Sequence, residues 1–457
     1  MSYRLLVPAL LAAAVPLLPA LVSCSSSSGS GPGGGDSGCP GCASSKIQHL
    51  VLIVQENHSF DSYFGGYCTA AAGSSPTCND GPACCEAAPA TDPAGTTPLV
   101  LDDSSMGAFD PNHCAACETA EIDTGKMDAY SSAPLPKGDP CNPIDNTTCG
   151  NKRNVAYGDR NVVKPYWDLA GQGALADRYF QPLVGQSSSN DMYFARAAFV
   201  FQDNAYEPQG AYGAKCGLNA AVPEQQFTDQ TIADLLIAAG VSFNVYAGGY
   251  GDMATAQKNG QCPAKAPSDC PLGFQTYPCV FDPSDIPFEY YPSTRDAVMK
   301  DISALASDLS AGTLPAVSFV KAVGYLSEHP GVGDKMSAGI GWATSIIQEI
   351  QGSPAAASTL IVLTYDESGG YFDHVTPPGN SPADGKPYGP RIPMLALGPF
   401  AKKNYVSHAV LEHSSIVKFI EWNWLGQQTG QLKTRDAIVS NLGDLLDPNA
   451  TGVAVPQ

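Results

Sequence analysis

The sequence predicts an α/β protein with a largely parallel sheet flanked by helices. Two apolar stretches rich in β-branched residues, 47–54 and 360–365, are short enough to be strands buried on both faces of such a sheet. Helix-like patterns alternate with further strand-like runs between them, which is the order of elements that parallel pairing requires. Hydrophobic residues make up 44% of the chain, so there is enough apolar material for a large core.

The elements can be placed along the chain from their periodicity and end signals. Strands are expected at 47–54, 241–246, 315–320, 360–365 and 392–397, and helices at 166–179, 231–239, 295–309, 338–350 and 415–425. Pro393 favours an edge position for the last strand, because proline cannot donate a backbone hydrogen bond. Residues from about 68 to 150 are rich in Gly, Pro, Ala and Cys, which predicts a disulfide-rich loop insertion within a single domain, 47–457.

The N-terminus has the pattern of an export signal. Arg4 precedes an apolar run that ends at Cys24, and this looks like a bacterial lipoprotein signal peptide over 1–23, with lipid attached to Cys24. An ordinary signal peptide cleaved nearby and an uncleaved anchor are the alternatives. Residues 24–46 are rich in Ser and Gly, as a flexible tether would be. We therefore expect an exported lipoprotein anchored to a membrane, at the outer membrane, in the periplasm or at the cell surface.

The cysteine count agrees with export. The chain has 15 cysteines, and lipidation of Cys24 would leave an even 14, which allows up to seven disulfides of the kind that exported proteins form. Two Cys-x-x-Cys pairs, Cys39/Cys42 and Cys114/Cys117, could instead bind zinc or act in redox chemistry. Their loop settings and the exported context favour structural bridges.

The charge balance limits the classes of partner. The net charge is −20, from 24 Lys and Arg against 44 Asp and Glu. Such a protein repels nucleic acid and anionic membrane surfaces, so no nucleic-acid partner is expected. An anionic substrate would need a local positive centre, which a bound metal ion could supply.

Polar side chains follow both buried strands directly. Asp366 and Glu367 come after one strand, and Glu56 and Asn57 come after the other. Ligand sites in open α/β sheets lie at the carboxyl ends of strands, so all four can meet at one edge. Adjacent carboxylates in a confined site need a nearby cation, and oxygen ligands of this kind suit a hard cation. A solvated acidic turn is the alternative, because most Asp-Glu pairs are of that kind.

Five short motifs occur in a family-like order. They are E-N-H-S-F-D at 56–61, G-Q-S-S-S-N at 185–190, S-E-H-P at 327–330, T-Y-D-E-S-G-G-Y-F-D-H-V at 364–375 and E-H-S-S at 412–415. Together they resemble the bacterial phosphoesterase family of secreted phospholipases C and acid phosphatases, which is similar to the alkaline-phosphatase-like superfamily. The resemblance extends over nearly the whole chain from residue 47.

The resemblance implies an alkaline-phosphatase-like fold and one divalent metal ion of unspecified identity. Its ligands would be Glu56, Asn57, Asp366, Glu367 and the hydroxyl of Ser187. Ser187 would also be the nucleophile, because a metal can lower the pKa of a serine hydroxyl and hold it in line with phosphorus. Only the family spacing selects this serine over the two that follow it.

Three histidines fall in motifs and are expected to be catalytic. His113, His329 and His374 would neutralise phosphate oxygens or protonate the leaving group, which requires groups that titrate near the working pH. His413 is ambiguous, since it precedes the last helix and could act there as a cap.

The chain also departs from the family pattern. Gln186 and Ser189 stand where the nucleophile turn usually has prolines, and Asp191 replaces a frequent arginine, which removes positive charge near the substrate. Serine in place of threonine at the nucleophile position leans towards the acid-phosphatase branch. No C-terminal β domain of the kind found in larger phospholipases C is expected after the last helix. The substrate is therefore expected to be a phosphate ester, either a small molecule or a phospholipid.

Two other functions are alternatives to a phosphoesterase. A catalytically inactive surface lipoprotein could keep the same fold as a binding module. A metal-dependent sulfatase is a weaker alternative, because no cysteine here stands in the Cys-x-Pro-x-Arg setting that its modified nucleophile requires.

Overall fold

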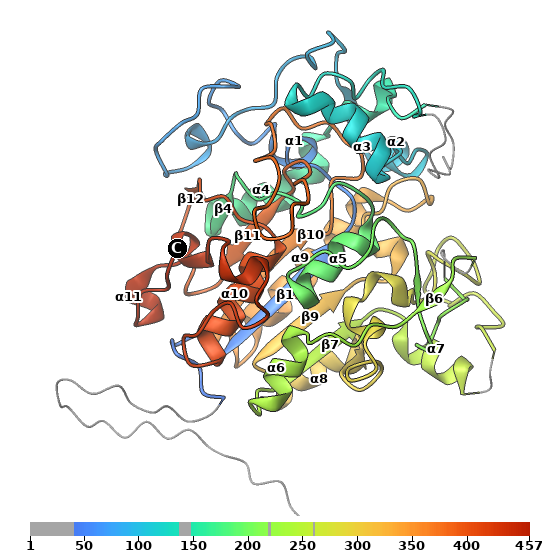
Figure 1. Ribbon diagram of the computed structural model, residues 1–457, viewed down its shortest axis with the longest axis vertical. Coiled ribbons are helices and arrows are strands. Elements are labelled where there is room, and N and C mark those ends of the chain that lie inside the picture. Colours follow the sequence, from blue (N-terminus) through green and yellow to red (C-terminus); the bar gives the residue numbers. More distant parts are fainter. Residues whose placement is uncertain (1–40, 137–147, 218–220, 259–260) are drawn as a thin grey trace, which may run out of the picture.

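The computed structural model describes residues 41–136, 148–217, 221–258 and 261–457 (Figure 1). The expected signal peptide, Cys24 and most of the expected tether lie outside these ranges. The part of the chain that is described contains no helix long and apolar enough to cross a membrane.

The centre of the protein is an eight-stranded, mostly parallel sheet (Figure 1), which confirms the predicted fold class. β1 pairs in parallel with both β10 and β9, whereas β11 runs antiparallel to β10 and β4. Across the sheet the order is β12 (Tyr405–Ser407), β4 (Ala174–Ala176), β11 (Met394–Leu397), β10 (Thr359–Tyr365), β1 (His49–Gln55), β9 (Val317–Lys321), β7 (Phe243–Ala247) and β8 (Met299–Asp301).

The pairing of β1 with β10 positions the expected site. Its register runs from His49 opposite Thr359 to Gln55 opposite Tyr365. Both strands therefore end level with each other, and Glu56 and Asp366 are the next residues on neighbouring strands. This shared edge is where ligand sites of parallel sheets occur.

Helices cover the sheet on both faces, as strands that are buried throughout require. α5 (Ser187–Arg196), α6 (Ile232–Ala238) and α10 (His413–Trp424) pack together in front of the sheet in Figure 1. α4 (Arg160–Gln172) and α9 (Met336–Gly352) pack against each other. The remaining helices are α1 (Phe60–Phe64), α2 (Asp103–Gly107), α3 (Ala115–Ile122), α7 (Tyr250–Gln257), α8 (Ser303–Ala311) and α11 (Pro448–Thr451).

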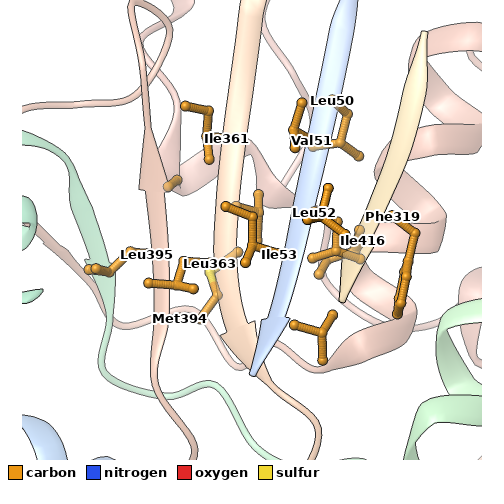
Figure 2. Packing of buried hydrophobic residues seen from close by; sticks show 14 of the residues in the cluster. Leu50, Val51, Leu52, Ile53, Phe319, Ile361, Leu363, Met394, Leu395 and Ile416 are labelled. Carbon is orange, nitrogen blue, oxygen red and sulfur yellow. The ribbon is translucent and has the colours of Figure 1, made fainter. Parts of the chain in front are cut away.

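The main core consists of the inward-facing residues of these layers. Figure 2 shows Leu52 of β1 beside Phe319 of β9 and Ile416 of α10, and all three are buried. Short parallel pairs outside the main sheet are formed by β2 (Leu99–Leu101) with β3 (Ala156–Gly158) and by β5 (Glu207–Pro208) with β6 (Glu224–Gln225).

Two predicted helices are wrong over part of their length. The helix expected at 166–179 ends at Gln172, because Gly173 has an extended conformation (φ −135°) and the next three residues form β4. In the range 295–309, where a helix is expected, a turn leads into β8, and α8 starts only after Asp301, whose Oδ1 accepts from Ser303 N at 3.0 Å. Strands of three residues are too short to show a period of their own, so the helical pattern of the flanking residues extends over them.

The predicted edge position of the strand at 392–397 is also wrong. β11 lies inside the sheet, between β10 and β4. Pro393 precedes the strand and disturbs no pairing, and its carbonyl accepts a hydrogen bond from Thr364 Oγ1 at 2.9 Å. The sheet continues past β11 because β4 and β12 extend it.

The insertion expected at about 68–150 contains β2, α2 and α3 and is held by disulfides. Every cysteine in the described ranges is disulfide-bonded, which confirms the structural role predicted for them. Cys114 and Cys117 do not pair with each other, because Cys117 bonds to Cys149. The other described pairs are Cys68–Cys85, Cys78–Cys84, Cys216–Cys262 and Cys270–Cys279.

The end of the expected tether is packed against the domain. Ser44 N donates to Asn423 O at 2.6 Å, and Ser45 Oγ donates to Asn423 Oδ1 at 2.7 Å. Residues of the expected tether 24–46 therefore contact α10 before β1 begins.

Replacing Ile53 with alanine tests how much the central strand contributes. Ile53 is 0% exposed in β1, so Ile53→Ala should lower the free energy of unfolding by about 2–5 kcal/mol through lost burial and a cavity. Ile438, which is 50% exposed, provides the matched control, and Ile438→Ala should change it by about 0.5 kcal/mol or less. Denaturant titration measures both, and equal losses in the two variants would contradict the central place of β1.

Candidate active site

The nucleophile turn lies at the N-terminus of α5. Gly185 has a φ of +134° and Gln186 is the N-cap, so Ser187 is the first residue of the helix and is 3% exposed. The side chain of Asn190 holds the turn closed: its Oδ1 accepts from Leu183 N at 3.0 Å, and its Nδ2 donates to Gly185 O at 2.7 Å. The N–H groups of a first helical turn favour negative charge, so an anion beside Ser187 would be stabilised.

Asn57 connects this turn to the ends of β1 and β10. Ser187 Oγ donates to Asn57 Oδ1 at 3.4 Å, and Asn57 N donates to Asp366 Oδ1 at 3.0 Å. Asp366 Oδ2 and Glu367 Oε1 are buried without a hydrogen-bond partner within the described ranges. Four of the five expected metal ligands thus lie next to one another at the carboxyl edge of the sheet: Ser187, Asn57, Asp366 and Glu367.

Gly369 lets the two turns come close together. Its φ is +65°, and a Cβ atom there would lie 2.2 Å from the carbonyl oxygen of Asn57. Asn57 itself has a φ of 62°, a conformation that side-chain-bearing residues rarely adopt. The double glycine after the carboxylates is therefore required by a close backbone approach as well as by the turn.

Two of the three expected histidines lie beside this group. The Nδ1 atoms of His113 and His329 contact the backbone carbonyls of Pro111 and Pro330, each at 2.7 Å. These contacts place a proton on Nδ1 and leave Nε2 available. His113 Nε2 lies 3.4 Å from Asn57 Nδ2, and the ring centroids of the two histidines are 6.2 Å apart.

Negative charge accumulates at this edge. Burial raises the pKa of Asp366 to about 6, and the neighbouring charge of Glu56 adds to the shift. Burial and the charge of Asp366 raise the pKa of Glu367 well above its usual range. His113 Nε2 is 3.7 Å from Glu367 Oε1. The negative charge of these carboxylates favours binding of a cation and disfavours binding of an anion without a cation.

The fifth expected ligand, Glu56, has a partner that the sequence did not reveal. Lys321 Nζ lies 2.7 Å from Glu56 Oε1 and 3.8 Å from Asp191 Oδ2, and the lysine is 3% exposed. Burial is the largest single effect and would raise the pKa of Glu56, but the charge of Lys321, the charge of His329 and the hydrogen bond to Lys321 together outweigh burial, and the net shift is downward. Lys321 is the last residue of β9, so its position at the carboxyl end of a strand was the signal that could have found it.

Asp191 stands at a position where the family often has an arginine. It lies one helical turn after Ser187 on α5. Its side chain is fully buried, and neither oxygen accepts a hydrogen bond from any described residue. Burial raises its pKa well above the usual range, against the opposing effect of Lys321. The positive charge that the arginine would have brought thus comes from a lysine on a different element.

His413 supports the site from behind and does not cap its helix. Its Nε2 donates to Asp366 O at 2.7 Å, its Nδ1 accepts from Tyr179 Oη at 2.8 Å, and its ring stacks on Phe194 with centroids 3.8 Å apart. Burial lowers the pKa of His413 to about 3, so the ring is neutral. The helix cap is Glu412, whose side chain accepts from Ser414 N.

The third expected histidine, His374, lies in a different cluster. Its Nδ1 contacts Asp61 Oδ2 at 2.7 Å, and its Nε2 contacts Glu86 Oε2 at 3.1 Å. Arg391 donates to Asp61 and to Asp373 in the same cluster, at 3.0 and 2.9 Å. None of the described contacts of His374 reaches Ser187, so the structure does not bring it together with the nucleophile turn.

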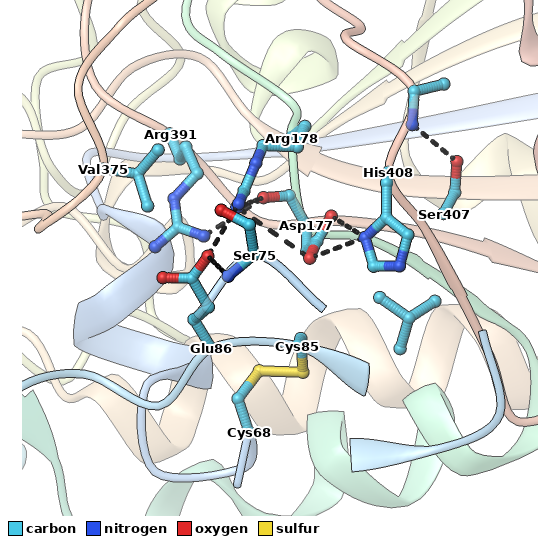
Figure 3. Close-up of polar contacts among 12 residues, drawn as sticks. Cys68, Ser75, Cys85, Glu86, Asp177, Arg178, Val375, Arg391, Ser407 and His408 are labelled. Atoms are coloured by element: carbon cyan, nitrogen blue, oxygen red, sulfur yellow. Dashed lines mark hydrogen bonds and ion pairs between the residues drawn. A yellow bond between two sulfur atoms is a disulfide. The ribbon is translucent and has the colours of Figure 1, made fainter. Parts of the chain in front are cut away.

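The second cluster continues from Glu86 of the insertion to charged residues that follow β4 and β12 (Figure 3). Arg178 Nη2 donates to Glu86 Oε1 at 2.9 Å, and Asp177 lies between Arg178 and His408, whose Nδ1 is 2.9 Å from Asp177 Oδ1. Glu86 follows Cys85, which bonds to Cys68. The cluster therefore ties the beginning of the insertion to the sheet.

Residues 47–425 match the Phosphoesterase family. The chain belongs to this family. Membership makes this phosphoesterase a hydrolase of phosphoric ester bonds and agrees with the resemblance of its motifs.

Curated relatives of this phosphoesterase include two bacterial phospholipases C. Phospholipase C B of Mycobacterium tuberculosis is 25% identical over 460 residues, covering 88% of this chain and 78% of that protein. Non-hemolytic phospholipase C of Pseudomonas aeruginosa is 25% identical over 418 residues, covering 82% of this chain and 53% of the relative. The chain thus spans about half the length of the second relative.

Among solved structures, a protein in the alkaline phosphatase superfamily from Vibrio parahaemolyticus superposes with a TM-score of 0.31 and 14% identity, over 56% of this chain and 59% of that one. Lipoteichoic acid synthase LtaP from Listeria monocytogenes gives a TM-score of 0.34 and 12% identity, over 59% and 67%.

His374 should make stability depend on pH. Burial is the largest single effect and would lower the pKa of His374, but the charge of Asp61, the hydrogen bond to it and the charge of Asp373 together outweigh burial, and the net shift is upward. A raised folded-state pKa contributes stability that is complete below the ordinary value and is lost as the pH rises through the raised value. His374→Gln should therefore reduce the free energy of unfolding more at about pH 5.5 than at about pH 9. Denaturant titrations of both proteins check this, and a difference that does not change with pH would contradict it.

Proposed function

We propose that this phosphoesterase is an exported, lipid-anchored enzyme that hydrolyses phosphate monoesters or phosphodiesters through a metal-assisted serine nucleophile. The observation that carries the proposal is the meeting of Ser187, at the first turn of α5, with Asn57 and the carboxylates of Asp366 and Glu367. A nucleophile, an anion-binding helix end and unpartnered oxygen ligands are what transfer of a phosphoryl group requires.

The donor set fits one hard divalent cation. Asp366 Oδ2 and Glu367 Oε1 are buried without hydrogen-bond partners among the described residues, and carboxylate, amide and hydroxyl oxygens suit such an ion. Glu56, Asn57, Ser187, Asp366 and Glu367 would hold it. When bound, the cation would lower the pKa of the serine hydroxyl and offset the charge of the phosphate.

Ser187 carries the covalent step. Its Oγ attacks phosphorus, the ester bond to the leaving alcohol breaks, and a phosphoserine forms. Water then attacks the same phosphorus, and the serine is released with phosphate or a phosphomonoester. Asn57 orients the hydroxyl through the 3.4 Å contact to its Oδ1, and the first turn of α5 stabilises the anion.

The two nearby histidines move the protons. With the proton on Nδ1 bonded to a backbone carbonyl, His113 and His329 each present an unprotonated Nε2. Either can accept the proton of the Ser187 hydroxyl as it attacks and pass it to the leaving oxygen, and can then take a proton from the attacking water and return it to Ser187 Oγ. A catalytic role for His374 remains a prediction, and its bonds to Asp61 and Glu86 favour a role in positioning the insertion.

The substrate is proposed from the family and from the relatives' names. Both relatives are named phospholipases C, and a phosphate ester, either soluble or on a phospholipid, fits the same chemistry. Initial rates on a chromogenic phosphate ester and on phosphatidylcholine, each with added divalent metals, would separate the two. Absence of turnover on both, with the metal bound, would instead favour the inactive binding module.

The nucleophile and the metal ligands should give different defects. Asp366→Ala removes a charged ligand, so metal content and turnover should fall together. Ser187→Ala removes the attacking oxygen and one neutral ligand, so metal should still bind while turnover falls on the order of 10³-fold or more. Metal analysis and initial rates on the same samples measure both.

Ser188→Ala and Ser189→Ala are the matched controls for this prediction. Ser188 Oγ has no hydrogen-bond partner within the described ranges, and Ser189 Oγ donates to Gln186 O at 2.7 Å. Both variants should keep most of the activity. If one of them is inactive while Ser187→Ala is active, the wrong serine has been assigned, and if none matters, water is the direct nucleophile.

The proposed anchor predicts a change of location without loss of catalysis. Lipid on Cys24, which lies outside the described residues, would hold the protein by its acyl chains alone. Cys24→Ala should therefore move the protein from the membrane fraction to the soluble fraction at unchanged specific activity. Fractionation followed by an assay checks this, and a variant that stays with the membrane would refute the lipid anchor. The disulfides are consistent with export.

A further inference from the structure

A buried carboxylate of the insertion reaches the site from outside the motifs. Glu118, in α3, is 0% exposed. Its Oε2 accepts from Gly185 N at 2.7 Å and from Gln181 Nε2 at 2.9 Å, and its Oε1 accepts from Ser368 Oγ at 2.8 Å. One side chain therefore makes three hydrogen bonds to two segments of the chain that are far apart in sequence, 181–185 and the turn at Ser368.

These two segments carry the two halves of the active site. Gly185 belongs to the turn that presents Ser187, and Ser368 directly follows the expected ligand Glu367. Gln181 completes the link, since its Oε1 accepts from Ser368 N at 2.8 Å. Glu118 and Gln181 together fix the distance between the nucleophile turn and the carboxylate turn.

The helix that carries Glu118 is itself fixed at several points. Cys117, the preceding residue, bonds to Cys149. At the start of the helix, Asp203 Oδ1 accepts both from Ala115 N at 2.9 Å and from Gln186 N at 3.2 Å. The insertion and the nucleophile turn are thus joined at two places, and α3 cannot move without moving the turn.

We propose that Glu118 is a positioning residue of the active site, through which the disulfide-stapled insertion sets the separation between Ser187 and the carboxylates of Asp366 and Glu367. The proposal rests on the proposed function for its effect on turnover. The contacts themselves do not depend on that function. Glu118 touches neither the reacting hydroxyl nor an expected metal ligand through any described hydrogen bond, so it acts through the turns.

The hydrogen bonds of Glu118 predict which substitution at this position keeps the two turns in place. A glutamine has the same shape, and its oxygen can accept from Gly185 N and Gln181 Nε2 while its amide donates to the hydroxyl of Ser368. Burial also raises the pKa of Glu118 to about 8, so a neutral side chain suits this place. Alanine would leave these donors without an acceptor.

The test compares four full-length variants under oxidising conditions with a chromogenic phosphate ester and added divalent metal. Glu118→Ala should lower kcat by about 10²-fold with KM little changed, because misplacement of reacting groups costs rate more than binding. Glu118→Gln should restore kcat to within about 3-fold of wild type. Ser368→Ala removes only one of the three bonds and should lower kcat less than Glu118→Ala does. It also serves as the test variant if Glu118→Ala fails to fold.

Glu121→Ala is the matched control. Glu121 is a buried carboxylate on the same helix, but it accepts from Asn154 Nδ2 at 2.7 Å and from neither turn. Its loss should lower the melting temperature and leave kcat unchanged. If Glu121→Ala lowers kcat as much as Glu118→Ala, or Glu118→Gln is as poor as Glu118→Ala, the proposal is overturned.

Hydrogen exchange separates this proposal from the proposed function. In Glu118→Ala, backbone amides of the peptides around Gly185 and Ser368 should exchange faster, whereas Glu121→Ala should leave both peptides unchanged. A wild-type protein without turnover would refute the proposed function, and the exchange rates would still decide the role of Glu118. Unchanged exchange at both turns in Glu118→Ala would refute the positioning role even if the wild type is active.

Discussion

The parallel pairing of β1 with β10 is the constraint on which the site depends. Because the two strands are paired along their whole length and end at the same level, the polypeptide after each strand has to turn at the same edge. Asn57 and Asp366 then meet through a backbone-to-carboxylate bond, and Gly369 permits the contact. A shift of one residue in this register would turn every strand side chain to the opposite face, so the site and the core are specified together.

Charge compensation explains much of the remaining architecture. Burying carboxylates at the edge of the sheet lowers stability unless their charge is compensated, and the described structure compensates it with ion pairs at two places. Lys321 pairs with Glu56 on one side, and Arg391 pairs with Asp61 and Asp373 in the second cluster. Between these ion pairs, Asp366 Oδ2 and Glu367 Oε1 have no hydrogen-bond partner in the described part of the chain, and such oxygens can take up a cation.

Sequence reasoning recovered what depends on local pattern. The long apolar runs predicted β1 and β10, and the polar residues after them were expected at one edge, where the structure has them. Three-residue strands such as β4 have no detectable period and were missed. Lys321 and the support of Asp366 by His413 depend on contacts between distant segments. His374 follows the carboxylates closely in sequence, but the turn at Gly369 and Gly370 directs it to the other cluster.

The parts of the protein that position the site differ in local stability. The carboxylates extend from central strands that are shielded on both faces by the main core. Glu118 comes from the insertion, where the apolar cluster around α3 contains, among the described residues, only Cys114, Cys117, Ala133 and Cys149 as buried members. Segments with little apolar contact open more often than the core. On heating, the segment around α3 is therefore expected to open before the central strands do, so the turns that Glu118 joins would separate while the sheet is still folded.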